Sequence, residues 1–224
     1  MAKFSSLVAL PDHVQIEMQA RFKIVLSIFS ESPTLQEVLK MRSYIAGGAI
    51  RSALLGEKIN DVDVFLFNVE SLEYLSSALI NEDGSLKIKI ANGWSFKNTI
   101  NSFTFEHEKN LYPKVQIIHK HTKMPSLMVR EFDLRCNMNY YIPSCDYLHI
   151  EALDEILEKR LHVNINNCSV VNTFYRFHKF VAKGWKYDGK ELASLVILLS
   201  KLDPIESRDE VQDQLLMGMS EVEF

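Results

Sequence analysis

The stretch that decides the fold covers residues 44–67, Y-I-A-G-G-A-I-R-S-A-L-L-G-E-K-I-N-D-V-D-V-F-L-F. It begins with an apolar run that leads into Gly47-Gly48, and a glycine pair permits a tight turn and a close backbone approach to a ligand. Residues 49–55 have the apolar spacing of one helical face, and Gly56 suits a left-handed C-terminal cap. Residues 62–67 are mostly β-branched or aromatic, as in a buried strand. The stretch therefore predicts a strand, a tight turn, a short helix and a second strand.

Two aspartates, Asp61 and Asp63, lie at the start of the second predicted strand. Residues two apart in an extended chain point to the same face of a sheet, so both carboxylates converge. Carboxylates this close repel each other, and a positive group is expected between them. Hard divalent cations fit this place, and we expect two Mg²⁺ or Mn²⁺ ions in contact with nucleotide phosphates. The Gly47-Gly48 turn leads into a helix N-terminus, which offers backbone N–H groups to phosphate oxygens.

The pattern G-G-x-x-R-x-x-L-L-G followed by D-x-D resembles the nucleotidyltransferase superfamily of DNA polymerase β. Within it, the pattern is most similar to the branch of poly(A) polymerases and CCA-adding tRNA nucleotidyltransferases. The residues that carry the resemblance are Gly47, Gly48, Arg51, Leu54, Leu55, Gly56, Asp61 and Asp63. A lone D-x-D is common on acidic strands, whereas the whole pattern, in order and on the expected elements, is specific.

The resemblance implies an enzyme that moves a nucleoside monophosphate from an NTP, with ATP among the candidates, to a hydroxyl acceptor and releases pyrophosphate. It implies that Asp61 and Asp63 are catalytic metal ligands and that Gly47 and Gly48 cradle the phosphates. Arg51 would either pair with those phosphates or hold its helix against the strand of the aspartates.

A second informative segment is residues 130–141, R-E-F-D-L-R-C-N-M-N-Y-Y. Its apolar and polar residues alternate, which predicts a strand with Asp133 and Asn137 on the polar face. The segment resembles R-R-D-F-T-x-N-A of the CCA-adding branch, which implies that both residues serve the ribose side of the nucleotide site. In the wider superfamily a third carboxylate on a neighbouring strand completes the metal site, and this would make Asp133 a catalytic metal ligand. Arg130 is displaced by one position from the motif's arginine pair, and both roles, like a plain edge-strand position, stay open.

Length and composition favour one α+β protein, because 224 residues with 47% hydrophobic content can bury a sizeable core. We expect a mixed sheet of about five strands flanked by helices, forming a nucleotidyltransferase head with N-terminal helices over 1–165. A short helical annex would follow over 166–224. Helices are predicted at 12–30, 34–41, 70–80, 170–185, 192–202 and 211–219, and further strands at 86–90, 99–106 and 114–119.

Charge and cysteine usage narrow the functional classes. The net charge of −4 provides no global basic field for nucleic acid, so an RNA substrate would need a local patch. The three cysteines lack C-x-x-C spacing, which favours reduced thiols in the cytoplasm over a disulfide framework or a zinc site. No apolar run is long enough to cross a bilayer, and we expect no membrane partner.

The resemblance covers roughly residues 40–185 and leaves substrate choice open. The E-D-x-x-R segment that selects the base in the CCA-adding branch has no counterpart, and the 39 residues after Trp185 (224 minus 185) are too few for that branch's tRNA-holding helices. The acceptor stays open between tRNA or another RNA, a protein and a small molecule, and by analogy a phage-encoded or toxin-like transferase is compatible with this architecture. The alternative is a catalytically inactive nucleotidyltransferase-like domain that serves as a nucleotide-binding or protein-interaction module. The oligomeric state is also open.

Overall fold

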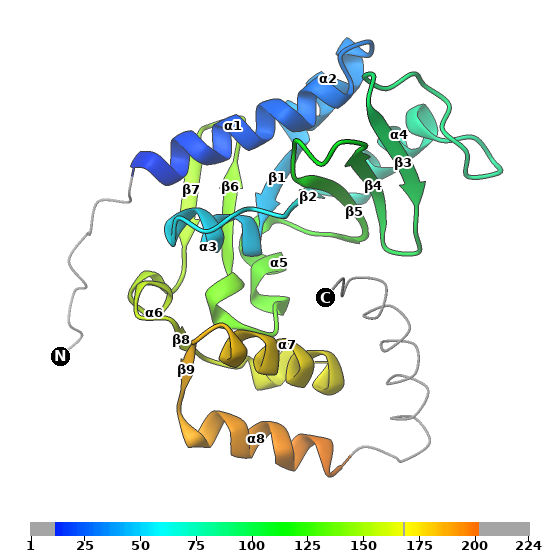
Figure 1. The fold of residues 1–224 in the computed structure, drawn as a ribbon. Coiled ribbons are helices and arrows are strands. Elements are labelled where there is room, and N and C mark those ends of the chain that lie inside the picture. The colour runs from blue at the N-terminus through cyan, green and yellow to red at the C-terminus, as the bar shows by residue number, and fades with distance from the viewer. Residues whose placement is uncertain (1–11, 168, 202–224) are drawn as a thin grey trace. The chain divides into compact units, whose positions relative to one another are not determined.

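The computed structural model describes residues 12–167 and 169–201 (Figure 1). The described residues form two compact units. Unit 1 contains residues 12–129 and 139–150, and unit 2 contains the described residues of 130–138 and 151–201. Residues 151–165, predicted as part of the head, cluster with unit 2. The helix predicted at 211–219 lies outside the described residues.

Unit 1 is built on a mixed sheet of seven strands in the order β3-β4-β5-β2-β1-β6-β7. Strands β2 and β5 are parallel, and all other neighbours are antiparallel. The mixed α+β architecture is confirmed, while the expected number of about five strands is too low. The strands are β1 (Ser43–Ala46), β2 (Asp61–Leu66), β3 (Trp94–Asn98), β4 (Ser102–His107), β5 (Lys114–Thr122), β6 (Asn139–Ile142) and β7 (Tyr147–Ile150).

The sheet has more strands than expected because β3 and β7, each one strand of a hairpin, were not predicted from the sequence pattern. Strand β3 pairs with β4, and β7 pairs with β6. The strand predicted at 86–90 is wrong: only Leu86 forms a bridge, with Ile80, and the backbone N–H of Lys87 donates to the Leu79 carbonyl.

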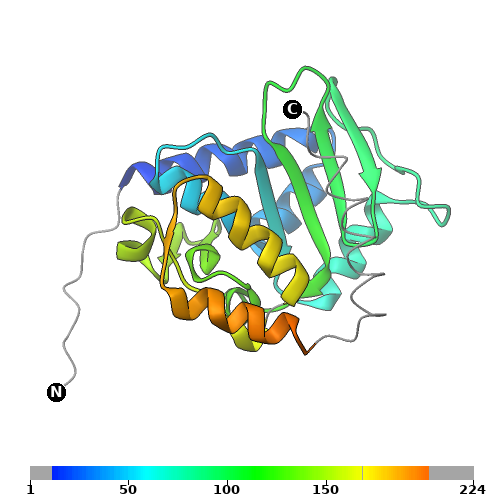
Figure 2. The same cartoon turned by 60° about the horizontal axis from the view of Figure 1, so that its bottom comes forward.

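Helices of unit 1 cover one face of this sheet. Figure 2 shows α1 (Asp12–Ile28), α2 (Pro33–Arg42) and α4 (Val69–Leu79) behind the strands. The helix predicted at 12–30 is confirmed as α1, and the residues buried on it are Val14, Met18, Phe22, Val25 and Ile28. The short helices α3 (Gly48–Leu54) and α5 (Pro125–Met128) complete the unit.

Successive side chains of β2 point to opposite faces of the sheet. Val62, Val64 and Leu66 are fully buried on one face. Phe65 shares the other face with the two aspartates, and its ring stacks on that of Tyr44 with the centroids 5.5 Å apart. The same strand therefore anchors the core and presents Asp61 and Asp63 at its beginning.

The strand predicted over 130–141 is wrong for most of its length. Residues 130–138 form two 3-10 turns, η1 (Val129–Glu131) and η2 (Arg135–Asn137), and only the last residues enter β6. The backbone pairs locally with residues 162–164: the N–H of Arg135 donates to the His162 carbonyl, and the N–H of Asn164 donates to the Asp133 carbonyl. The alternation of apolar and polar residues is not matched by alternating burial, since Asp133 and Leu134 are both buried.

Unit 2 packs this turn with short helices. It contains α6 (Leu153–Leu157), β8 (Arg160–Leu161), η3 (Ile165–Asn167), α7 (Val170–Ala182), β9 (Lys186–Tyr187) and α8 (Gly189–Leu199). Strands β8 and β9 form a parallel pair, and the core contains Leu134, Cys136, Ile156, Leu161, Phe177, Trp185 and Leu195. Among the residues that the structure describes, no helix has the length and apolar character of a membrane span.

Candidate functional site

The two aspartates lie where β1 ends and β2 begins. These strands are antiparallel, and Ala46 at the end of β1 pairs with Asp63. The glycine turn that follows β1 is therefore next to the carboxylates, as the sequence pattern predicts. The Asp61 side chain is 49% exposed, and Asp63 is half-buried. Both are accessible enough to bind a ligand.

The glycine turn has a conformation that requires glycine. Gly47 has φ 87° and ψ −135°, a region that side chains exclude, and its N–H donates to the Asn139 carbonyl on β6 at 3.0 Å. Gly48 starts α3, and a Cβ at this position would lie 3.4 Å from Nη2 of Arg51. The Arg51 guanidinium therefore lies against the bare Cα of Gly48, which places a cation at the turn.

Strand β5 adds two residues that the sequence analysis missed. The parallel register with β2 places Lys114 beside Asp61 and Gln116 beside Asp63. The Lys114 Nζ lies 3.4 Å from Oδ1 of Asp61. No local motif marks these residues, because the register between two strands is decided by packing.

The pair of aspartates suits a hard cation. Carboxylate oxygens are the ligands that Mg²⁺ takes, and one or two of them combined with substrate phosphates make a common site. Over the described part of the chain, no group of three or more His, Cys, Asp or Glu residues forms a larger metal-binding cluster. The donor set in unit 1 therefore fits a site that substrate phosphates complete.

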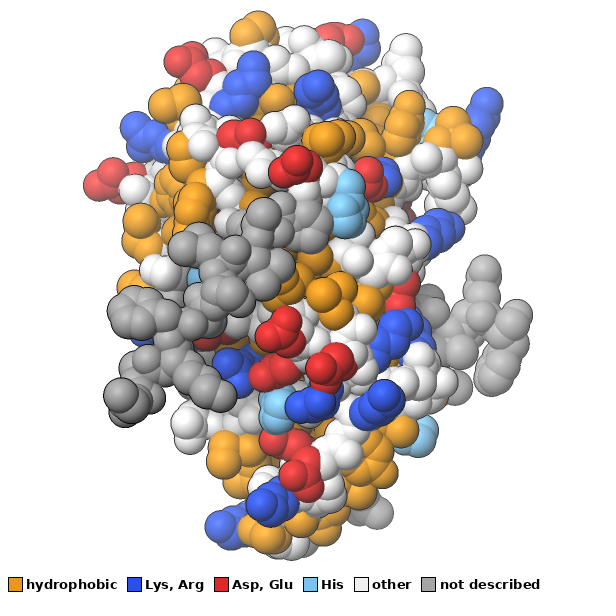
Figure 3. Space-filling model, turned by 90° about the vertical axis from the view of Figure 1, so that its left-hand side faces the viewer, with side chains coloured by type: hydrophobic (Ala, Val, Ile, Leu, Met, Phe, Trp, Pro, Cys, Tyr) orange, Lys and Arg blue, Asp and Glu red, His pale blue; other side chains and the backbone are white. Residues whose placement is uncertain are grey.

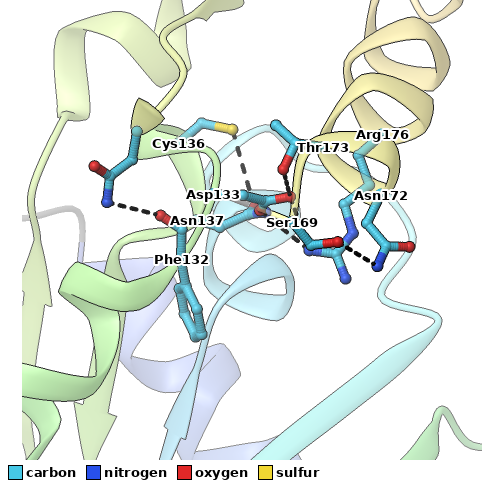
Figure 4. A network of polar contacts seen from close by, with 9 residues as sticks. Phe132, Asp133, Cys136, Asn137, Ser169, Asn172, Thr173 and Arg176 are labelled. Carbon is cyan, nitrogen blue, oxygen red and sulfur yellow. Dashed lines mark hydrogen bonds and ion pairs between the residues drawn. The ribbon is translucent and has the colours of Figure 1, made fainter. Parts of the chain in front are cut away.

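Asp133 and Asn137 lie in unit 2, within a separate polar network (Figure 4). Asp133 is 6% exposed. Thr173 on α7 donates its hydroxyl to Oδ2 at 3.1 Å, and Nη1 of Arg176 lies 3.1 Å from both carboxylate oxygens. Asn137 accepts a weak hydrogen bond from Sγ of Cys136 at 3.9 Å.

This network ties residues 130–138 to α7. The side-chain amide of Asn164 adds to it by donating to the carbonyls of Arg130 and Phe132. The structure thus brings Gly47, Gly48, Arg51, Asp61 and Asp63 together in unit 1, and it places Asp133 and Asn137 in unit 2.

The face shown in Figure 3 has no large area in which charged side chains of one sign predominate. Over the described residues of this face, acidic and basic side chains are interspersed with apolar ones. This agrees with the net charge of −4. On this face an anionic substrate would therefore be bound by specific residues rather than by a broad basic surface.

Several solved structures of CCA-adding enzymes have the same fold. The complex of a CCA-adding enzyme with CTP aligns with TM-score 0.55 and 14% identity, over 85% of this chain and 46% of that one. The complex of a CCA-adding enzyme with ATP aligns with TM-score 0.54 and 14% identity, over 90% of this chain and 50% of that one. The Thermotoga maritima CCA-adding enzyme complexed with tRNA aligns with TM-score 0.53 and 14% identity, over 82% of this chain and 43% of that one. The chain thus spans about half the length of these enzymes, and the similarity shows the nucleotidyltransferase fold.

Sequence comparison gives the family. No curated protein matches the chain. The model of the family described as "Gabija anti-defense 2 family protein" (Gad2) matches residues 17–159, which is more than half of the 224 residues. The protein therefore belongs to the Gabija anti-defense 2 family and has a nucleotidyltransferase fold.

Proposed function

We propose that this protein is a metal-dependent nucleotidyltransferase that moves a nucleoside monophosphate from an NTP to a hydroxyl acceptor. The observation that carries the proposal is the placement of Asp61 and Asp63 beside the Gly47-Gly48 turn, where the central strand β2 begins and its neighbour β1 ends. The fold shared with CCA-adding enzymes supports it.

In this reaction the acceptor oxygen forms a bond to the α-phosphorus of the NTP. The bond from the α-phosphorus to the bridging oxygen breaks, pyrophosphate leaves with that electron pair, and the acceptor proton passes to solvent. A divalent cation held by Asp61 and Asp63 would polarise the phosphate oxygens and lower the pKa of the acceptor hydroxyl.

The residues of unit 1 have distinct roles in this proposal. Asp61 and Asp63 would hold the divalent cation. Gly47 and Gly48 let the triphosphate approach the backbone, because neither carries a Cβ. The Arg51 guanidinium, which lies against Gly48, offers N–H donors to the phosphate oxygens.

For Asp133 we propose the ribose-side role rather than that of a metal ligand. Its two oxygens accept hydrogen bonds from Thr173 and Arg176, and these contacts hold residues 130–138 on α7. A carboxylate paired with a guanidinium is a poorer ligand for a divalent cation, since its charge is already compensated. Asn137, in the same segment, would contact the nucleotide.

The acceptor class follows from the reaction only in part. An RNA end, including that of tRNA, a protein hydroxyl and a small molecule all satisfy the chemistry. Because the family is described as anti-defense, we propose that the transfer counteracts the Gabija defense.

A second candidate is a non-catalytic nucleotide-binding or protein-interaction module. One observation favours it: Lys114 already compensates the charge of Asp61. The two candidates differ in whether the protein transfers a nucleotide to an acceptor.

The test uses the full chain with each of the four α-³²P NTPs, Mg²⁺ or Mn²⁺, and total RNA, protein or small-molecule extract as acceptor. We expect label in one acceptor fraction and its loss in the Asp61→Ala/Asp63→Ala variant. The matched control is Glu73→Ala, which removes an exposed carboxylate on α4 and should keep full activity. Transfer that persists in the double variant would refute the proposed site. A folded wild-type protein that labels no fraction would favour the binding module.

A further inference from the structure

Unit 2 contains a segment that is rich in basic residues and lacks acidic ones. Residues 159–187 include six Lys or Arg residues and no Asp or Glu. The whole chain has a net charge of −4, so the charge of this segment is opposite in sign to that of the molecule. A local cluster of this kind is what the binding of a polyanion requires when no global basic field exists.

The lysines of α7 share its exposed side with an aromatic ring. Tyr175, Lys179 and Lys183, the last at the C-cap, follow one another at intervals of four residues, and residues with this spacing form one row along a helix. All three are exposed, Tyr175 by 52%. Thr173 and Phe177, on the opposite side of α7, are buried. The row therefore faces solvent, and its two lysines are about 6 Å apart along the helix axis.

Acidic neighbours do not compensate the charges of this row. Over the part of the chain that the structure describes, neither Lys179 nor Lys183 forms an ion pair. Arg176 of the same helix pairs with Asp133, and its side chain is still 56% exposed (Figure 4). Lys186, just after the helix, is exposed as well. The exposed side of α7 thus presents several cations to an anionic ligand.

We propose that this side of α7 binds the phosphate backbone of a single-stranded nucleic acid, with Tyr175 stacked on a base. The ammonium groups replace the counterions of the phosphates, and the release of those counterions drives such binding. The exposed ring beside the cations favours a single strand, because its bases are accessible whereas those of a duplex are stacked inside. This inference goes beyond nucleotide transfer and does not depend on it.

Two other polyanionic partners fit this side of α7 less well. An anionic bilayer takes up the apolar side of a basic helix, and Phe177 on that side of α7 is buried in the core of unit 2. An acidic protein segment can pair with the lysines, but it has no planar base for the ring of Tyr175. The tyrosine in the row of lysines therefore favours nucleic acid.

The test measures the fluorescence anisotropy of labelled oligouridylate and oligothymidylate with the full chain, without NTP or divalent ions, over a series of KCl concentrations. We expect both strands to bind, with a slope of log K against log[KCl] of about −2 for contacts of about three cations. Lys179→Gln/Lys183→Gln should reduce the magnitude of this slope by about 1.4. Tyr175→Ala should weaken binding about tenfold at every KCl concentration and leave the slope unchanged.

Matched controls change the same residue types in unit 1. Lys23→Gln/Lys40→Gln removes two exposed ammonium groups from α1 and α2, and Tyr74→Ala removes a 46% exposed ring from α4. Neither control should change the affinity or the slope. Circular dichroism and the melting temperature verify that each variant is folded.

Three results would overturn the inference: no binding of either strand, an equal change of slope in both double-lysine variants, or equally effective displacement of the strand by poly-L-glutamate. The last result would indicate an acidic protein segment as the ligand. The same measurement on Asp61→Ala/Asp63→Ala separates this binding from the proposed function. If that variant binds the strand and the wild type transfers no nucleotide, the role of α7 is supported and the proposed function alone fails. If the wild type transfers nucleotide but binds neither strand, only the role of α7 fails.

Discussion

Removing the guanidinium of Arg176 leaves the Asp133 carboxylate as a buried charge in unit 2. Asp133 is 6% exposed, and Arg176 compensates it through contacts of 3.1 Å to both oxygens. The hydroxyl of Thr173 provides one further hydrogen bond at 3.1 Å. In Arg176→Met the apolar stem is retained, so that the loss of charge dominates the effect.

The magnitude follows from the unequal burial of the two partners. Removing one member of a fully buried pair costs about 3–5 kcal/mol, whereas exposed pairs contribute about 0.2–1 kcal/mol. The Arg176 side chain is 56% exposed and that of Asp133 only 7%, so solvent reaches the pair from one side. We expect Arg176→Met to lower the free energy of unfolding by about 2 kcal/mol, between these limits.

A double variant separates buried charge from lost packing. Asp133→Asn/Arg176→Met leaves no uncompensated charge, and we expect it to be more stable than Arg176→Met alone. Arg160→Met is the control, because Arg160 is 52% exposed and pairs with an exposed Glu158. Its effect should stay within about 0.5 kcal/mol.

The assay is urea unfolding followed by the fluorescence of Trp185. This residue is 3% exposed in unit 2, and the second tryptophan, Trp94 in unit 1, is replaced by Phe in every variant. A shift of the midpoint at constant slope reports the change in stability. If Arg176→Met costs less than about 0.5 kcal/mol, or if the double variant is no more stable than Arg176→Met alone, the buried-charge argument is wrong.

Three further variants test unit 1. Gly47→Ala should cost about 1–3 kcal/mol in a denaturation series, because φ 87° with ψ −135° excludes a Cβ. Gly48→Ala should keep the melting temperature, since a Cβ there lies at van der Waals distance, 3.4 Å, from the Arg51 guanidinium. It should reduce nucleotide transfer, since the added methyl group hinders the close approach of the triphosphate to the backbone; equal loss of stability in both variants would contradict this. Hydrogen bonds from Gln19 and Tyr141 hold the pKa of Asp146 below its usual value, so their stabilisation is present above about pH 4 and is lost as the pH falls through the lowered pKa. Tyr141→Phe, which removes a 2.8 Å hydrogen bond, should lower the melting temperature by about 2–4 °C at pH 7 and by less at pH 2; an equal loss at both pH values would argue against the charge of Asp146.

Local patterns were enough to predict the elements that carry the site in unit 1. The glycine pair predicted the turn, and the D-x-D strand predicted two carboxylates on one face. These features depend on residues a few positions apart, whose directions are set by the periods of the helix and the strand.

Packing between distant segments decided the rest. Residues 130–138 alternate like a strand, yet they form turns because residues 162–164 supply their backbone partners. Arg176 meets Asp133 across 43 positions, and Lys114 meets Asp61 through the register of two parallel strands. No local period encodes such pairs, because strand register and ion pairs between distant residues depend on how the whole core packs. The sequence by itself therefore determined the fold class and the pair of aspartates, and only the tertiary structure decided which charges surround them.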